Sequence, residues 1–358
     1  MYTLKPVVVH RAAAFFVAGG LVAAAMVFVG CSSEQNLNPI GEGGAGNTMK
    51  ELLKPDVESA QEPRQPAAAA DAKENFHIYL AFGQSNMEGQ NWNGSSVAYN
   101  DVLPITYKQN VDKRFRVMTA VSGSYKLASG SEQRSQGQWY TAVPPLIRNN
   151  LGLSPADYFG RALVAGIADT NIKIGIIAVA VAGSAIEGLE KGSGANTYFN
   201  TQQQYMKDIA ALYGGNPYDR LVTLAKEAQK VGVIKGIIMH QGESGAASGN
   251  WAQKVKGIYD NLLIDLGLPA NSIPFLAGQA YGNNNSNIAG LTNTMTAKLP
   301  SGANVAHIIS SSGCPSGGDN LHFSYEGYKT LGERYGQKML ELNYSKSTSI
   351  KPVTSRPD

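Results

Sequence analysis

The sequence predicts an α/β fold in which a five-stranded parallel sheet is covered by helices on both faces. Two observations lead to this prediction. Five short apolar runs alternate along the chain with longer segments whose apolar residues have helical spacing. Such alternation is typical of parallel sheets, because parallel strands need a crossover connection. In addition, small and polar residues follow four of the runs, at the place where open α/β sheets bind their ligands.

The predicted strands are runs of mainly apolar residues that end in polar or small residues. A run without alternation is typical of a strand that is buried on both faces, as strands of parallel sheets are. In chain order the predicted strands are 76–82, 172–181, 234–240, 273–279 and 305–310.

The predicted helices occupy the intervals between these strands and the end of the domain. Ser154 and Ser324 stand at the start of two of them and are candidate N-caps, because a serine oxygen can accept a free backbone N–H. The interval 91–154 has no clear pattern, and we expect it to be a long irregular region of functional importance. The predicted helices are 155–168, 217–231, 251–266, 286–299 and 324–342.

The first 31 residues have the composition of a targeting segment, with a weakly basic start and an apolar run over 12–30. Cys31 ends that run directly after Gly30, which resembles a bacterial lipoprotein signal that is cleaved before the cysteine that carries the lipid. The alternative is an uncleaved transmembrane anchor, because the run is near the length that spans a bilayer. We favour the lipoprotein, since the cysteine falls at the end of the run. Either interpretation places the globular part outside the cytoplasmic membrane, in the periplasm or at the cell surface.

Composition divides the rest of the chain. Residues 32–74 are rich in Gly, Ala, Pro, Gln and Glu and are expected to form a flexible tether. The globular domain is expected over 75–343, with a tail over 344–358. The net charge is only +3 and no run of Lys or Arg stands out, so nothing suggests a nucleic-acid partner.

Cysteine and histidine usage gives no reason to expect a metal or another cofactor. Cys314 is the only cysteine besides Cys31, so a lipidated Cys31 leaves no partner for an internal disulfide. The sequence has no paired cysteines and no His-x-x-x-His spacing, so it does not predict a zinc site.

The candidate nucleophile is Ser85, which follows the first predicted strand in the sequence GQSNMEG. Gly83 permits a tight turn that presents the serine hydroxyl to the crevice, with backbone N–H groups free to bind an anion. These are the requirements of a nucleophilic serine. The alternative is that Ser85 is only a turn residue.

A base and its carboxylate partner are available in other turns. His322 can take the serine proton, and Asp319, three residues before it, can orient the imidazole through the other ring nitrogen. Glu243 follows another predicted strand and is a second candidate for this partner, unless it orients Gln241 or the loops. The Ser85 N–H, the Gly183 N–H and the Gln241 amide can together form an oxyanion hole.

Four blocks, GQSNMEG, VAGSAIEGL, HQGES and DNLHFSYEGY, resemble those of the SGNH hydrolases. More narrowly, they are similar to the sialic-acid-acetylesterase-like carbohydrate esterases, the group that includes acetyl xylan esterases of carbohydrate esterase family 6. The resemblance covers about 76–342. It implies a three-layer α/β/α, flavodoxin-like fold and a metal-independent serine esterase that removes acetyl groups from sugars.

The resemblance also implies roles for the residues of these blocks. Ser85 would be the nucleophile, His322 the base and Asp319 the matching acid, with Gly183 and Gln241 in the oxyanion hole. Some relatives use the glutamate of the Gln-Gly-Glu block instead, so Glu243 stays a candidate. The sequence departs from the family at Ala182, where a second glycine is common, which leaves the shape of that turn open.

The function expected from the sequence is that of a lipid-anchored O-acetylesterase acting on acetylated xylan or a related plant polysaccharide. Gln84 and Asn86 beside the serine are candidate substrate-binding residues. Trp92 and Trp139 are further candidates because their rings can stack on sugars, although packing is an equally good interpretation for both. The alternatives are a sialate O-acetylesterase with the same catalytic residues and a non-catalytic, glycan-binding surface lipoprotein.

Overall fold

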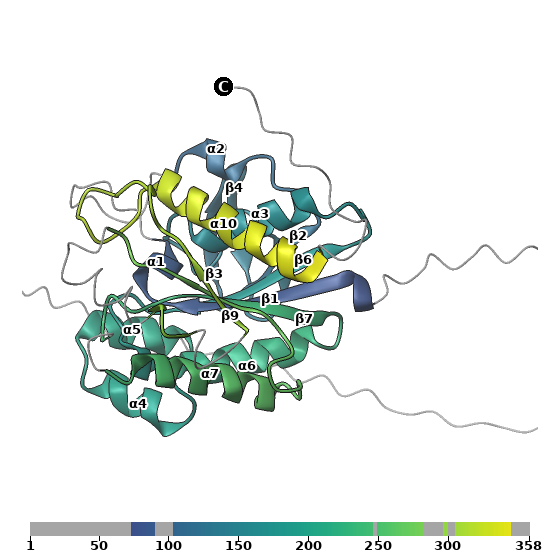
Figure 1. Cartoon of the computed structure of the whole chain (residues 1–358). Coiled ribbons are helices and arrows are strands. Elements are labelled where there is room, and N and C mark those ends of the chain that lie inside the picture. Colours follow the sequence, from purple (N-terminus) through teal and green to yellow (C-terminus); the bar gives the residue numbers. More distant parts are fainter. Residues whose placement is uncertain (1–72, 90–102, 246–248, 283–295, 300–304, 345–358) are drawn as a thin grey trace, which may run out of the picture. The chain divides into compact units, whose positions relative to one another are not determined.

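The computed structural model describes residues 73–89, 103–245, 249–282, 296–299 and 305–344 (Figure 1). Its central sheet is built outward from β1 (Phe76–Gly83), which lies between β6 (Lys173–Ala180) and β7 (Val233–His240) and runs parallel to both. All but the first residue of β1 are buried. An uninterrupted apolar run is what a strand in this central position requires, because both of its faces and both of its edges are covered.

Within the described residues the sheet has seven strands in the order β5-β2-β6-β1-β7-β8-β9. The two additional strands lie in the interval predicted as irregular: β2 (Phe115–Met118) pairs parallel with β6, and β5 (Trp139–Thr141) pairs antiparallel with β2. The prediction of five strands, all parallel, is therefore corrected by a sixth parallel strand and an antiparallel edge strand. Strands of three and four residues are too short to produce a recognisable pattern. The remaining strands are β8 (Phe275–Gly278) and β9 (Ala306–Ile309), with β3 (Gly123–Leu127) and β4 (Gly130–Arg134) forming a separate hairpin.

Helices cover both faces of the sheet, which confirms the three-layer α/β/α prediction. Helices α3 (Pro155–Gly166) and α10 (Tyr325–Tyr344) pack against each other on one face (Figure 1). Helices α6 (Pro217–Ala228) and α7 (Trp251–Asp265) lie on the other face. The buried apolar side chains of the described residues form two clusters, one on each face of the sheet.

The alternation of side chains along β1 divides it between the two cores. Ile78, Leu80 and Phe82 point into the core beneath α6 and α7, whereas Tyr79 and Ala81 point into the core beneath α3 and α10. This is the two-residue period of an extended strand. A shift of register by one residue would exchange the two sets of side chains, so the buried pattern fixes how β1 pairs.

Both predicted N-caps are confirmed. The Ser154 hydroxyl accepts the Ala156 N–H, and the Asp157 carboxylate accepts the Ser154 N–H in return, which completes a capping box at α3. The Ser324 hydroxyl accepts the Gly327 N–H at 3.2 Å at the start of α10. The predicted elements that fall on described residues begin and end within three residues of the observed ones.

Several short helices were not predicted, and one prediction cannot be compared with the structure. The helix expected over 286–299 lies mostly outside the described residues. The unpredicted helices are η1 (Lys73–Asn75), α1 (Ser85–Glu88), α2 (Ile105–Lys108), η2 (Ile186–Leu189), α4 (Ser193–Asn200) and α5 (Gln204–Leu212). Of the helices that the structure describes, none is both long and apolar enough to cross a bilayer.

The carboxyl ends of the parallel strands bring the polar segments to one edge of the sheet. The ends of β1 and β7 approach each other closely, because a Cβ on Gly83 would lie 2.1 Å from the His240 carbonyl oxygen. The Gln84 N–H donates to the same oxygen at 3.1 Å. A glycine is needed here for close approach, and it places the next two residues, Gln84 and Ser85, over the sheet edge.

Candidate active site

Ser85 is the first residue of α1, a single helical turn that follows β1 directly. It is nearly buried and lines a pocket of about 890 Å³. The turn ends at Gly89, whose φ of 80° and close approach to the Leu153 carbonyl exclude a side chain. The close backbone approaches at Gly83 and Gly89 therefore fix the position of Ser85 at the carboxyl end of β1.

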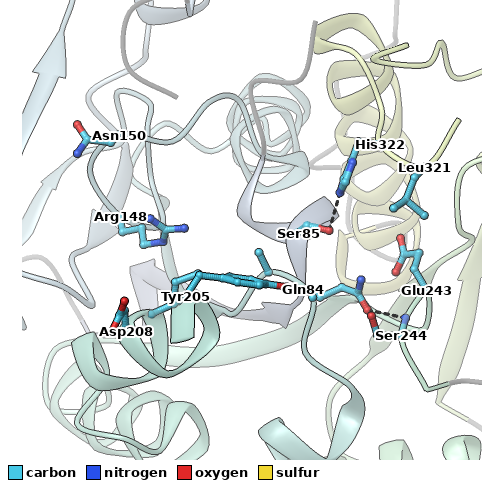
Figure 2. Close-up of a pocket in the computed structure, with 13 residues that line it drawn as sticks. Gln84, Ser85, Arg148, Asn150, Tyr205, Asp208, Glu243, Ser244, Leu321 and His322 are labelled. Atoms are coloured by element: carbon cyan, nitrogen blue, oxygen red, sulfur yellow. Dashed lines mark hydrogen bonds between the residues drawn. The ribbon is translucent and has the colours of Figure 1, made fainter. Parts of the chain in front are cut away.

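His322 stands beside the serine, on the loop before α10. Its Nε2 lies 2.8 Å from the Ser85 Oγ (Figure 2), and its Nδ1 lies 2.5 Å from an Asp319 carboxylate oxygen. When Nδ1 carries the proton that is shared with Asp319, Nε2 is free to accept the serine hydroxyl. The three side chains can therefore pass a proton from serine to imidazole and stabilise the charge that results.

The loop geometry explains how Asp319 reaches an imidazole only three residues away. Asn320 has a φ of 58°, the left-handed conformation that asparagine tolerates, and it turns the chain back. The second Asp319 oxygen accepts the N–H groups of Leu321 and His322 at 3.0 and 2.8 Å. Partial burial alone raises the pKa of Asp319, but these hydrogen bonds and the His322 ring outweigh it, so the pKa lies below its usual value. The carboxylate is therefore charged at neutral pH.

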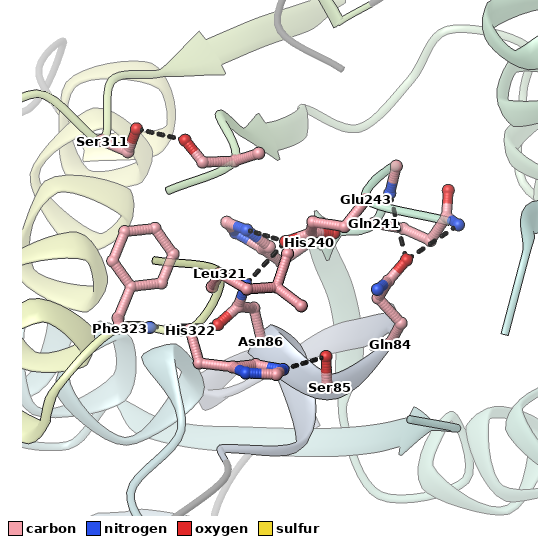
Figure 3. Close-up of polar contacts among 12 residues, drawn as sticks. Gln84, Ser85, Asn86, His240, Gln241, Glu243, Ser311, Leu321, His322 and Phe323 are labelled. Atoms are coloured by element: carbon pink, nitrogen blue, oxygen red, sulfur yellow. Dashed lines mark hydrogen bonds and ion pairs between the residues drawn. The ribbon is translucent and has the colours of Figure 1, made fainter. Parts of the chain in front are cut away.

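Glu243 belongs to a different set of hydrogen bonds and ion pairs from Asp319. It accepts the Asn86 side-chain N–H at 2.6 Å and lies 3.3 Å from the Nε2 of His240, at the end of β7 (Figure 3). Burial alone raises the pKa of Glu243, but the hydrogen bond and charge of His240, with the Asn86 amide, lower it overall. Of the two candidate carboxylates, the geometry therefore places Asp319 on the imidazole and Glu243 in a second, deeper network.

Asn86 connects that deeper network to the imidazole. Besides Glu243, its amide N–H lies 3.1 Å from the Leu321 carbonyl oxygen, and its Oδ1 accepts the Phe323 N–H at 3.3 Å and the Tyr328 hydroxyl at 2.9 Å (Figure 3). Leu321 and Phe323 are the two neighbours of His322. Asn86, predicted to bind substrate, is fully buried and lies behind the pocket, where it ties the imidazole loop to the serine turn.

Replacing Asn86 with alanine is expected to lower kcat by about 10- to 100-fold while changing KM little. The substitution removes the contacts on both sides of His322 and leaves the buried Glu243 carboxylate without its amide partner. A leftover buried acceptor should also reduce the free energy of unfolding by about 1–3 kcal/mol. Steady-state kinetics and urea unfolding measure the two effects. The matched control is Asn343→Ala, which removes a side-chain hydrogen bond to the Lys235 carbonyl, far from Ser85. Equal kcat values for the Asn86 and Asn343 variants would contradict the positioning role of Asn86.

Of the three predicted oxyanion donors, two line the pocket and one does not. Gly183 lines the pocket with a φ of 74°, and Ser85 lies beside it. Gln241 does not line the pocket: its amide N–H groups face the Ser244 carbonyl at 2.9 Å and the oxygens of Gln84 and Ser184 at 3.2 Å. The structure therefore does not bring Gln241 to the substrate side.

Gln84 occupies the position that was expected for Gln241. Its side-chain oxygen accepts from the Gln241 amide and from the Ser244 N–H at 3.1 Å. Figure 2 shows its amide nitrogen turned away from Ser244. Since Gln84 lines the pocket, this nitrogen is a side-chain donor available beside the serine. Gln241, itself held by the Trp251 indole N–H, fixes the orientation of that donor.

The turn at Ala182, where the sequence departs from the family, is held by a residue that sequence reasoning missed. Glu88 is fully buried, and its carboxylate accepts the Ala182 N–H at 3.2 Å and pairs with Arg148 at 3.1 Å. Glu88 lies within the quoted GQSNMEG block, so an acid at the end of a serine turn was the available signal. It joins α1 to the turn that carries Gly183.

The tryptophans do not reach the pocket in the part of the chain that the structure describes. Trp139 packs on Phe76 with ring centroids 4.7 Å apart and lies against Gly175, near the opposite end of β6. The packing interpretation therefore holds for Trp139. Trp92 and Cys31 lie outside the described residues. The aromatic residue that lines the pocket is Tyr205 of α5, which sequence reasoning missed together with its neighbour Asp208.

The described residues contain no group of three or more His, Cys, Asp or Glu side chains arranged to hold a metal ion. The chemistry that this arrangement can perform is nucleophilic attack by a serine with proton transfer through an imidazole.

Comparison with known proteins identifies a family and several structural relatives. The family described as "Carbohydrate esterase, sialic acid-specific acetylesterase" matches residues 75–341, most of the chain. A protein of Arabidopsis thaliana of known structure has a TM-score of 0.54 at 21% identity, covering 75% of this chain and 99% of its own. The structure of NanS has a TM-score of 0.51 at 17% identity, covering 77% and 99% of the two chains. At these identities the two structures support the fold alone.

Proposed function

The chain belongs to the carbohydrate esterase family of sialic acid-specific acetylesterases, and we propose that it is a serine esterase in which Ser85, His322 and Asp319 remove O-acetyl groups from sugars. The observation that carries this proposal is the continuous contact from the Ser85 hydroxyl through the His322 ring to the Asp319 carboxylate, with Ser85 and His322 both lining the pocket. A glycan-binding protein without catalysis would have no use for such a relay.

In the first half of the reaction, the Ser85 oxygen attacks the acetyl carbonyl while its proton passes to the Nε2 of His322. Asp319 stabilises the imidazolium that results. The negative charge on the carbonyl oxygen is met by the N–H groups of Ser85 and Gly183 and by the side-chain amide of Gln84. His322 then gives its proton to the departing sugar oxygen, which leaves an acetyl group on Ser85.

In the second half, a water molecule attacks the acetyl-serine and gives its proton to His322. Collapse of the tetrahedral intermediate breaks the ester bond, the Ser85 oxygen recovers the proton, and acetate leaves. The same donors stabilise the charge in both halves, because the oxygen that becomes negative occupies one place throughout.

The substrate proposed first is acetylated xylan or a related plant polysaccharide, and the alternative is an O-acetylated sialic acid. The test is acetate release from acetylated xylan, acetylated pectin and O-acetyl sialic acid, with p-nitrophenyl acetate as a substrate that needs no sugar recognition. Hydrolysis of at least one acetylated glycan is expected. Failure on every substrate by folded protein would refute the esterase proposal.

We also propose that the domain is tethered to a membrane through a lipid on Cys31, ahead of the linker over 32–74. The support is the apolar run that ends in Gly30-Cys31. Metabolic labelling with a fatty acid should mark the protein, and Cys31→Ala should abolish the label. Continued labelling of that variant would contradict the proposal.

A further inference from the structure

The wall of the pocket that lies across from Ser85 is formed by α5 and by the loop before α3. Tyr205, Asp208 and Ile209 all line the pocket, at the spacing of one helix face. Arg148 extends from the loop beside them (Figure 2). Neither the catalytic relay nor the oxyanion donors use these side chains, so what they can bind is a separate question.

Tyr205 is exposed over 46% of its surface, which is unusual for an aromatic side chain in a pocket wall. Its hydroxyl lies against Gly183, because a Cβ on that glycine would be 2.3 Å from the Tyr205 oxygen. The tip of the ring therefore lies close to the oxyanion turn, and the ring forms part of the pocket wall (Figure 2). An aromatic face held in this way offers an apolar surface to the C–H groups of a sugar ring.

The charges on this wall disfavour an anionic ligand. Among the described residues that line the pocket, Arg148 is the only one with a permanent positive charge. Its guanidinium is paired at 3.1 Å with Glu88, whose side chain is wholly buried. The charge of Arg148 is therefore already balanced by the buried Glu88 carboxylate, and the pair adds no net positive charge to the wall. Asp208, exposed on the same wall, adds a negative charge.

The internal segments outside the described residues contribute no basic side chain that could offset these negative charges. The sequence over 90–102, 246–248, 283–295 and 300–304 contains no Lys, Arg or His. None of these segments can therefore supply a positive charge to the pocket. Asp101 lies in the first of them and would add a further negative charge to its surroundings.

We propose that this wall is the subsite for a neutral sugar, with Tyr205 as the stacking surface and Asp208 as an acceptor for sugar hydroxyls. The site would then act on acetylated neutral pentose or hexose units and discriminate against acetylated sugars that carry a carboxylate, sialic and uronic acids included. This inference rests on the proposed esterase function. It differs from the specificity that the family description names.

The experiment compares kcat/KM for an acetylated xylo-oligosaccharide, an O-acetylated sialic acid and p-nitrophenyl acetate. The wild-type protein is expected to prefer the neutral oligosaccharide over the sialic acid by at least about 100-fold, the size expected when a carboxylate meets an unfavourable charge arrangement. Comparable values for the two sugars would overturn the proposal.

Variants of α5 separate stacking from charge. Tyr205→Ala is expected to raise KM for the oligosaccharide about tenfold. The rise in KM for p-nitrophenyl acetate should be at least about fivefold smaller, because that substrate has no sugar ring to stack. Tyr205→Phe keeps the aromatic ring and should keep most of the affinity for the oligosaccharide. Asp208→Lys should improve kcat/KM for the sialic acid several-fold at low salt, with less gain at high salt. Leu212→Ala, at an exposed position on the same helix, is the matched control. Equal losses for Tyr205→Ala on both substrates would contradict the stacking role.

Binding can be measured without hydrolysis, which separates this inference from the proposed function. In the Ser85→Ala protein, calorimetry should detect the acetylated xylo-oligosaccharide and show binding of the acetylated sialic acid at least about 100-fold weaker. That result would support the subsite even if no ester were cleaved by the wild-type protein. Tighter binding of the sialic acid would overturn it.

Discussion

Replacing Ser85 with alanine should reduce acetate release by roughly a thousandfold or more while leaving the protein folded. The variant has no nucleophile, and what remains is the catalysis that the oxyanion donors and substrate binding supply on their own. Its only expected structural loss is the hydrogen bond to the His322 ring at 2.8 Å, worth about 1 kcal/mol. Initial rates of acetate release, with circular dichroism as the check on folding, measure this.

The matched control for Ser85 is Ser184→Ala. Ser184 is also buried and lies in the turn beside Gly183, but its hydroxyl has no hydrogen-bond partner among the described residues. Its removal should leave the rate within a few-fold of the wild-type value. A folded Ser85→Ala protein that turned over like the wild type would show that the nucleophile lies elsewhere.

Asp319→Asn should lower kcat by a factor on the order of ten thousand, the size of the loss that the corresponding change causes in trypsin-like serine proteases. The Asp319 carboxylate accepts two backbone N–H groups with one oxygen and faces the His322 Nδ1 with the other. In the asparagine variant the side-chain oxygen would keep the backbone contacts and the NH₂ would face Nδ1. That arrangement stabilises the tautomer protonated on Nε2, which cannot take the serine proton.

Glu243→Gln should cost far less, about tenfold, because Glu243 is linked to the His322 loop through the Asn86 amide, whereas Asp319 faces the imidazole itself. The glutamine oxygen can still accept the Asn86 amide N–H, so the loop that carries His322 stays in place. The two variants are compared on one acetylated substrate, with folding checked by circular dichroism. A larger loss in Glu243→Gln than in Asp319→Asn would reverse the assignment of the acid.

The elements that were predicted well are those with strong local signals. The apolar run of β1 and the serine caps of α3 and α10 depend on residues that are close in the chain, and the structure has each where it was predicted. The misses were elements with weak local signals. Strands β2 and β5 are too short for a pattern, and α5 has only two buried residues among nine. Tyr205 was missed for that reason.

Residue type and spacing made Ser85 and His322 candidates for the nucleophile and the base, and left Asp319 and Glu243 as two candidates for the acid. A serine must follow a buried strand at a tight turn, and an acid three residues before a histidine can reach it when the loop bends at Asn320. The sequence by itself thus determined the fold class, the edge of the sheet where the polar segments meet, and the candidates from which the relay is drawn.

Only the tertiary structure decided how residues from distant segments divide their roles. Asn86 and Glu243 are 157 positions apart, and they meet because β1 and β7 are neighbours in the sheet. The same adjacency places the Gln241 amide on Gln84 and leaves Gln84, rather than Gln241, on the pocket side. Strand order and register bring these side chains within hydrogen-bond distance of one another. A list of residue types contains no such distances, so it could name the candidates but could not say which carboxylate meets His322.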